Sequence, residues 1–83
     1  MSEIEKWLVN WLADNGGNDK KEIEKSMKES YFAAGFIDSF QFINMISDIE
    51  DEFDIEFDNE QFEDRSFSTV SGMAKIIERM CEK

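Results

Sequence analysis

The sequence predicts an all-α fold, a small bundle of three long helices and one short helix. Apolar residues recur at helical spacing in three separate segments, and each segment begins with a side chain typical of a helix N-cap. The alternation expected of a strand appears only briefly, at 53–57. Since 83 residues is the length of one small domain, we expect a single domain over 1–83.

The first helix is expected to begin after Ser2, which forms a capping box with Glu5. The turn-forming run Asp-Asn-Gly-Gly-Asn at 14–18 then ends it. Residues 19–30 are mostly charged and are compatible with either a surface helical turn or a long connection. The apolar stripe of this helix, which we expect in the core rather than at a ligand site, comprises Ile4, Trp7, Leu8, Trp11 and Leu12.

The second long helix is expected to begin at Asp38, with Gln41 completing its cap, and to fade near Asp54. Phe40 and Ile43 extend its apolar surface sideways. Its inward stripe comprises Phe42, Met45, Ile46, Ile49 and Phe53.

A minor helix is expected over 59–64, docked by Phe57 and Phe62. Ser68 is expected to cap the last helix. The stripe of the last helix comprises Val70, Met73, Ala74, Ile77 and Cys81, which places the one cysteine in the core as a small packed hydrophobe.

The composition excludes several function classes. A net charge of −11 excludes a typical nucleic-acid binder, because such proteins use Lys and Arg to neutralise phosphates. The chain has no His and one Cys, so we expect no imidazole base, no internal disulfide and no CxxC zinc site. No apolar run approaches the roughly 18 residues of a membrane span, and the acidic start lacks the basic region of a secretory signal. We therefore expect a soluble cytoplasmic protein with little equipment for catalysis and no metal site built on His or on paired Cys residues.

The negative charge is concentrated in one segment. Residues 38–64 contain 11 acidic side chains and no basic one, whereas the rest of the chain carries as many bases as acids. This segment is either a solvated face that keeps the protein soluble or a docking face for basic partners. Its alternating carboxylates resemble a calcium loop, but Asn59 stands where an EF-hand needs Gly and Arg65 where it needs Glu, so only loose binding of divalent ions remains open.

Ser39 is the strongest candidate for a residue that is covalently modified. If Asp38 is the cap, the Ser39 hydroxyl is free, and an attached phosphate would be favoured by the positive end of the helix dipole. On these local grounds alone the serine is an ordinary residue of a helix start. Nucleophilic catalysis is not indicated, since no His and no Gly-x-Ser-x-Gly motif accompany it.

The motif around Ser39 resembles that of the acyl carrier proteins, which bear phosphopantetheine. The resemblance rests on Gly-Phe-Ile-Asp-Ser-Phe at 35–40, the acidic helix that runs into Phe-Asp-Ile at 53–55, and the Ser-Thr-Val that opens the last helix. It covers 31–81 well, and the first helix fits the family in length and position. It implies a carrier rather than an enzyme, with a role in fatty acid or other lipid biosynthesis.

The resemblance implies that 4′-phosphopantetheine, donated from coenzyme A by a phosphopantetheinyl transferase, is attached covalently to Ser39. Its thiol would hold an acyl or aminoacyl group as a thioester for the enzymes that load and transfer it. Asp38 would contribute to recognition by the transferase. Partner enzymes would contact Phe40, Ile43, Glu50 and Asp51 on a monomeric carrier.

The motif also departs from that of housekeeping fatty-acid carriers. Gly35 is one residue further from the Asp-Ser pair, Phe40 replaces Leu, and Asn44 and Ser47 stand where those carriers have an acidic residue and Met. The Gly-x-x-Asp-Ser spacing is more similar to D-alanyl and other specialised stand-alone carriers. The alternative from another class is a non-covalent acidic adaptor or decoy, which would bind a basic partner surface without needing Ser39.

Overall fold

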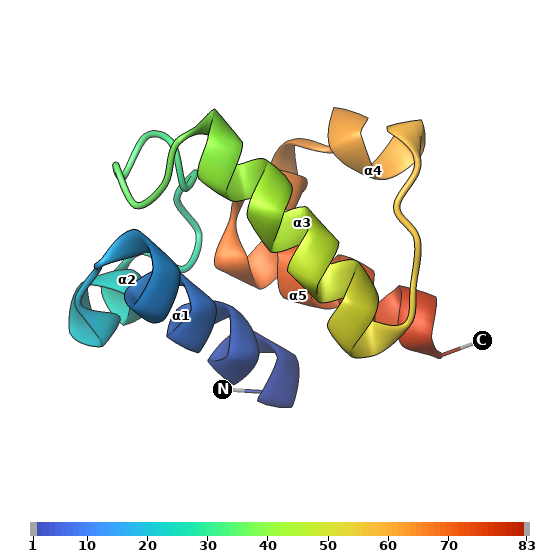
Figure 1. Ribbon diagram of the computed structural model, residues 1–83, viewed down its shortest axis with the longest axis horizontal. Coiled ribbons are helices and arrows are strands. Elements are labelled where there is room, and N and C mark those ends of the chain that lie inside the picture. The colour runs from blue at the N-terminus through green and yellow to red at the C-terminus, as the bar shows by residue number, and fades with distance from the viewer. Residues whose placement is uncertain (1, 83) are drawn as a thin grey trace.

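The computed structural model describes residues 2–82 as a bundle of three long helices joined by short helical turns. The long helices are α1 (Glu3–Gly16), α3 (Ser39–Phe53) and α5 (Val70–Cys81). The short elements are α2 (Lys20–Lys25), α4 (Asn59–Glu63) and the 3₁₀ turn η1 (Arg65–Ser68). Figure 1 shows α3 crossing in front of α5, with α1 alongside and α4 at the edge. The predicted all-α bundle is confirmed, and the segment 19–30 contains a second short helix.

The helix ends follow from local side-chain chemistry. Ser2 and Glu5 form the expected capping box, in which the Glu5 backbone N–H donates to the Ser2 hydroxyl at 3.2 Å. The first helix ends at Gly17, whose φ of 68° is left-handed and strains any residue with a Cβ. Asp54 ends α3, at the place where the sequence predicted that the helix would fade, and it too adopts a left-handed conformation.

The predicted cap of the last helix was wrong by one residue. Thr69 is the N-cap of α5, and its hydroxyl accepts from the Gly72 N–H at 3.0 Å. Ser68 lies in η1, because Asp64 caps a separate 3₁₀ turn just upstream. Ser68 and Thr69 are both competent caps, and the position of this turn decides between them.

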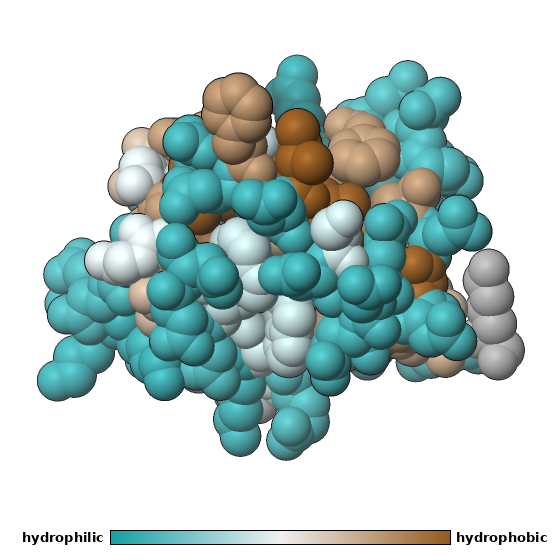
Figure 2. Space-filling view, in the orientation of Figure 1, coloured by the Kyte–Doolittle hydropathy of each residue, from teal (hydrophilic) through white to brown (hydrophobic). Residues whose placement is uncertain are grey.

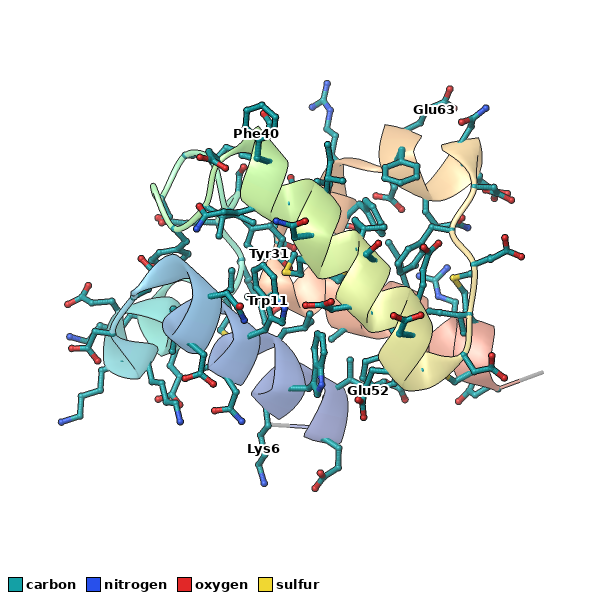
Figure 3. The ribbon with its side chains drawn as sticks, viewed as in Figure 1. Lys6, Trp11, Tyr31, Phe40, Glu52 and Glu63 are labelled. Atoms are coloured by element: carbon teal, nitrogen blue, oxygen red, sulfur yellow. The ribbon has the colours of Figure 1, made fainter. Side chains whose placement is uncertain are left out.

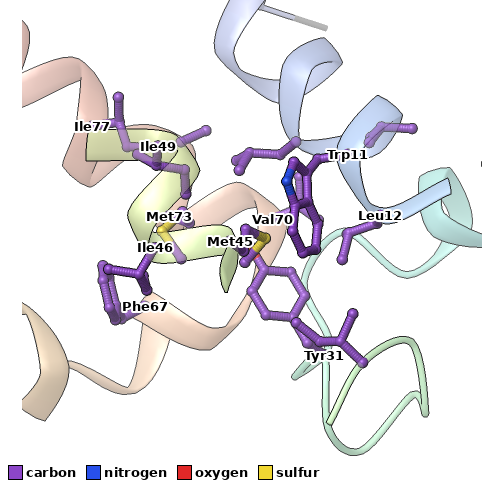
Figure 4. Packing of buried hydrophobic residues seen from close by; sticks show 14 of the residues in the cluster. Trp11, Leu12, Tyr31, Met45, Ile46, Ile49, Phe67, Val70, Met73 and Ile77 are labelled. Carbon is purple, nitrogen blue, oxygen red and sulfur yellow. The ribbon is translucent and has the colours of Figure 1, made fainter. Parts of the chain in front are cut away.

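The core lies where α1, α3 and α5 meet (Figure 4). The expected stripes supply most of it, but Ile4, Trp7, Phe42 and Phe53 are only partly buried. Phe57 and Phe62 pack edge-on against the buried Phe67, with ring centroids 4.9 and 5.2 Å apart, as the predicted docking requires. The buried apolar side chains outside the predicted stripes are those of Val9, Ile23, Tyr31, Ile37, Phe67 and Ile76.

Cys81 is exposed, which corrects its expected burial. It is the last residue of α5, and Figure 1 shows this end of the helix projecting beyond the bundle. A stripe position contributes to the core only where another element covers it.

Tyr31 is the one tyrosine of the chain, and it is fully buried, with no hydrogen-bond partner for its hydroxyl among residues 2–82. Burial raises the pKa of this phenol well above its ordinary value, because the low-dielectric interior disfavours the anion. The folded state therefore holds the Tyr31 proton more tightly than the unfolded state does. The resulting stability is present below the unfolded pKa of about 10 and is lost as the pH rises above it.

We predict that Tyr31 does not ionise while the protein is folded. In an alkaline titration, the near-ultraviolet absorbance of tyrosinate should appear together with the loss of helical circular dichroism. Tyr31→Phe should weaken the alkaline unfolding and, by removing an unpaired buried hydroxyl, leave stability at neutral pH unchanged or raise it by about 1 kcal/mol. Ionisation near pH 10 with the helices intact would show that the hydroxyl reaches solvent.

Candidate attachment site at the start of α3

Ser39 is the first residue of α3, and its side chain is exposed. The Asp38 carboxylate accepts from the Gln41 backbone N–H at 2.9 Å, and the Gln41 side chain accepts from the Asp38 N–H at 3.1 Å. This capping box uses Asp38 and Gln41, so the helix start needs nothing from Ser39. The hydrogen bonds found among residues 2–82 do not involve the Ser39 hydroxyl.

The turn over 31–38, which we call the attachment turn, fixes where Ser39 lies. The Tyr31 N–H donates to the Ser68 carbonyl at 2.8 Å, and the Phe36 N–H donates back to the Tyr31 carbonyl at 2.9 Å. Gly35 adopts a φ of 76°, a left-handed conformation that favours glycine. Ile37 is buried and anchors the turn to the core just before the exposed Asp38.

Asn18 ties the attachment turn to the end of α1. Its side-chain amide donates to the Phe36 carbonyl at 2.7 Å and to the Leu12 carbonyl at 3.1 Å. Gly16 packs closely against the attachment turn, because a Cβ added to it would lie 2.8 Å from the Phe36 carbonyl oxygen. The Gln41 side chain makes a further link to α1 by donating to the Asn15 carbonyl at 3.2 Å. Sequence analysis missed these links, because they join residues distant along the chain.

Phe40 and Ile43 are among the most exposed large apolar side chains of the described residues, at 80% and 64% of full exposure. The positions of Phe40, Ile43, Ser47 and Asp51, spaced by three or four residues, put them on one outward face of α3. Figure 3 shows Phe40 at the end of α3 where the helix begins, and Figure 2 shows apolar surface along this edge. Of the predicted partner residues, Phe40, Ile43 and Asp51 thus share a face, whereas Asp38 precedes the helix as its N-cap and Glu50 is half-buried.

Glu50 is half-buried and has a structural role. Its carboxylate accepts from the Phe57 backbone N–H at 2.9 Å, which holds the segment between α3 and α4 against the helix. Asp48 is likewise engaged, since it accepts from the indole N–H of Trp11 at 2.7 Å and so joins α3 to α1. The Trp11 ring is buried, in agreement with its expected place in the core. A buried indole needs an acceptor, which is the signal that could have pointed to an acidic partner.

The structure also bears on metal and membrane binding. Within 2–82, no three His, Cys, Asp or Glu side chains gather in a way that could hold a metal ion. No helix in this range combines the length and apolar character needed to cross a bilayer.

Comparison with known proteins identifies the family. Residues 6–77 match the profile described as "Phosphopantetheine attachment site". The chain belongs to the acyl carrier protein family. It is 36% identical over 67 residues to the acyl carrier proteins of Lactococcus lactis subsp. cremoris strains MG1363 and SK11, an alignment that covers 81% of this chain and 82% of each relative. The acyl carrier protein of Lactococcus lactis subsp. lactis strain IL1403 matches equally well. No solved structure matches the chain significantly.

Membership of this family implies a covalently attached 4′-phosphopantetheine. The chemistry at Ser39 fits such a group, since attachment needs an exposed hydroxyl that the fold does not use. The helix dipole favours a phosphodiester at this position, and so do the Ser39 and Phe40 backbone N–H groups, which donate in none of the hydrogen bonds of residues 2–82. The family match extends through the attachment turn and α3.

We predict that Asn18→Ala loosens the attachment turn. The variant leaves the Phe36 carbonyl without its bond, so the free energy of unfolding should fall by about 1–3 kcal/mol in urea titrations. Amide hydrogen exchange at 35–38 should accelerate more than in the core of α5. Asn10→Ala, an exposed site on α1, is the matched control and should change stability by less than about 0.5 kcal/mol. Equal exchange rates in the two variants would refute the role of Asn18.

Proposed function

We propose that this protein carries an acyl or aminoacyl group as a thioester on 4′-phosphopantetheine attached to Ser39 and delivers it to partner enzymes. The observation that carries the proposal is the free, exposed hydroxyl at the first position of α3, beside a capping box made by other residues. When bound, the prosthetic group supplies a flexible arm and a thiol. The protein then acts as a single carrier domain in the cytoplasm, and we propose that it is a monomer.

The residues around Ser39 serve the attachment. Asp38 holds the start of α3 through its backbone and side chain, so the hydroxyl is presented in one place. Its exposed carboxylate also offers a contact for a basic phosphopantetheinyl transferase. Ile37 and the bonds of the attachment turn keep this position fixed while the arm moves.

We propose that partner enzymes dock on the outward face of α3. Phe40 and Ile43 provide apolar contacts next to Ser39, and Asp51 provides charge toward the other end. The excess of acid over 38–64 steers basic surfaces toward this face at long range. Glu50 has a smaller part than the sequence suggested, because one of its oxygens already holds Phe57. Brief contacts of this kind suit a carrier that visits several enzymes.

We propose further that this is a dedicated carrier for a few cognate enzymes rather than a housekeeping fatty-acid carrier. The support is the motif itself: the glycine spacing before Asp38, Phe40 in place of Leu, and the polar Asn44 and Ser47, both of which are exposed on α3. A general fatty-acid malonyl transferase should load it several-fold more slowly than a housekeeping carrier. Equal loading rates would contradict this part of the proposal.

The attachment site is tested by intact mass spectrometry. Incubation with coenzyme A and a broad-specificity phosphopantetheinyl transferase should add the mass of one 4′-phosphopantetheinyl group. Ser39→Ala should abolish the gain, whereas Ser47→Ala, an exposed serine on the same helix, should keep it. No gain in the unchanged protein would favour the acidic adaptor, whose binding would survive Ser39→Ala.

The docking face is tested by charge reversal. Asp51→Lys should lower kcat/KM of the transferase several-fold at low salt, and the deficit should shrink as added salt screens the interaction. Glu24→Lys on α2 makes the same change of charge at another exposed site and should have a much smaller effect. Equal losses in both variants would mean that only net charge matters, and that the face of α3 has no special role.

A further inference from the structure

A hollow of about 490 Å³ lies beside α5, and four cationic side chains line it: Lys28, Arg65, Lys75 and Arg79. Among residues 2–82, those that line the hollow include no carboxylate and no residue of α3. Its volume lies within the range of small-molecule sites. This hollow is separate from the attachment site, and the proposed carrier function does not use it.

The fold brings these cations together from distant parts of the chain. Lys75 and Arg79 lie one turn apart on α5. Lys28 is held nearby because the Ser71 backbone N–H donates to the Met27 carbonyl at 2.9 Å. Arg65 begins η1, which packs so closely on α5 that a Cβ on Gly72 would clash with the Ser66 carbonyl.

The side chains that line this hollow are positively charged, whereas the protein as a whole is negatively charged. Four of the nine basic residues line it, in a chain whose net charge is −11. Like charges that converge on one hollow repel one another unless an anion or carboxylates offset them. Asp64 lines an adjoining hollow with Arg79 and offsets part of its charge, while its carboxylate also accepts from the Ser66 N–H and hydroxyl at 2.9 and 2.8 Å. These bonds, and to a lesser extent Arg79, lower the pKa of Asp64. Other carboxylates adjoin the same cations in neighbouring hollows: Glu5 and Glu78 beside Lys28 and Lys75, Glu78 and Glu82 beside Lys75 and Arg79, and Glu60 beside Arg79. They reduce the local positive charge, but none of them lines this hollow.

The polar groups of the hollow suit an oxyanion. Two arginines offer planar donor groups that match phosphate oxygens, and two lysines add compact positive charge. The Thr69 and Ser66 hydroxyls are engaged within the fold, since Thr69 donates to the Ser66 carbonyl at 2.9 Å and Ser66 donates to Asp64. Ser71, whose hydroxyl has no such role among the hydrogen bonds of the described residues, adds a further donor.

We infer that this hollow is a binding site for a phosphate group of a small soluble molecule that carries two or more negative charges. A small anion enters the local positive field without bringing a large charged surface close to the acidic segment 38–64. An anionic membrane would have to approach the whole negatively charged protein. A lipid headgroup and a free phosphate compound offer the same phosphate group, and the negative charge of the whole protein favours the free compound.

The experiment titrates the full-length protein with pyrophosphate and follows backbone amides by NMR. Saturable shifts should appear at 65–72 and around Lys28, Lys75 and Arg79, with little change at Ser39. The double variant Lys75→Gln/Arg79→Gln should weaken binding about tenfold or more, since two charge-assisted contacts are lost. Lys20→Gln/Lys21→Gln on α2 removes the same charge at exposed sites and should change the affinity less than about twofold. All four positions are exposed, and circular dichroism would verify that each variant is folded.

Three outcomes would overturn the inference. The first is equal weakening in both double variants, which would indicate only nonspecific attraction. The second is binding to anionic phosphatidylglycerol vesicles without any response to pyrophosphate, which would indicate a membrane surface. The third is that the same amides shift with protein concentration alone, which would indicate contact with the acidic face of a second copy. Every readout is independent of Ser39, so failure here would leave the carrier proposal unaffected.

Discussion

The site depends on one constraint: Asp38, not Ser39, caps the start of α3. A helix start needs acceptors for its first N–H groups, and a serine beside it would ordinarily supply one. Here Asp38 and Gln41 satisfy that need reciprocally, and Gln41 also reaches the end of α1. The Ser39 hydroxyl is therefore fixed in place by its neighbours and yet free for chemistry. The attachment turn reinforces this arrangement, because Asn18 and Tyr31 bind it to α1 and η1.

The second organising feature is the separation of charge. The acidic residues of 38–64 lie on α3, on α4, in the segment joining them and at the flanking caps Asp38 and Asp64. Two of them, Asp48 and Glu50, link parts of the fold through Trp11 and Phe57. Four cations gather instead around α5 and η1. The negative potential around α3 and α4 suits the binding of basic enzymes, and the positive potential around α5 and η1 suits the binding of a small anion.

The elements governed by local chemistry could be predicted from the sequence. The caps at Ser2 and Asp38 and the stripe of α3 depend on residues a few positions apart. The structure has both caps as expected, and it buries the middle of the stripe while leaving Phe42 and Phe53 partly exposed. The family, too, was recognisable from the motif around Ser39, and the comparisons bear this out. The cap at Asp38 predicted a free Ser39 hydroxyl, and the family resemblance implied that Phe40 and Ile43 face partners; the side chains of all three are exposed.

Features that depend on tertiary contacts could not be predicted in this way. The choice of Thr69 over Ser68 as a cap depends on the 3₁₀ turn before it, and the exposure of Cys81 depends on where the bundle ends. The burial of Tyr31 and the role of Asn18 arise from links to η1 and α1. No spacing in the sequence connects Lys28 with Arg79, and their shared hollow exists only in the folded chain.

The most direct measurement of the central claim is peptide mapping of the protein purified from its native host. Tryptic cleavage after Lys28 and Arg65 releases a peptide that contains Ser30, Ser39 and Ser47, and fragmentation distinguishes these three serines. Our account predicts a 4′-phosphopantetheinyl group on Ser39 alone. A group on either of the other serines, or a peptide that is never modified, would contradict it.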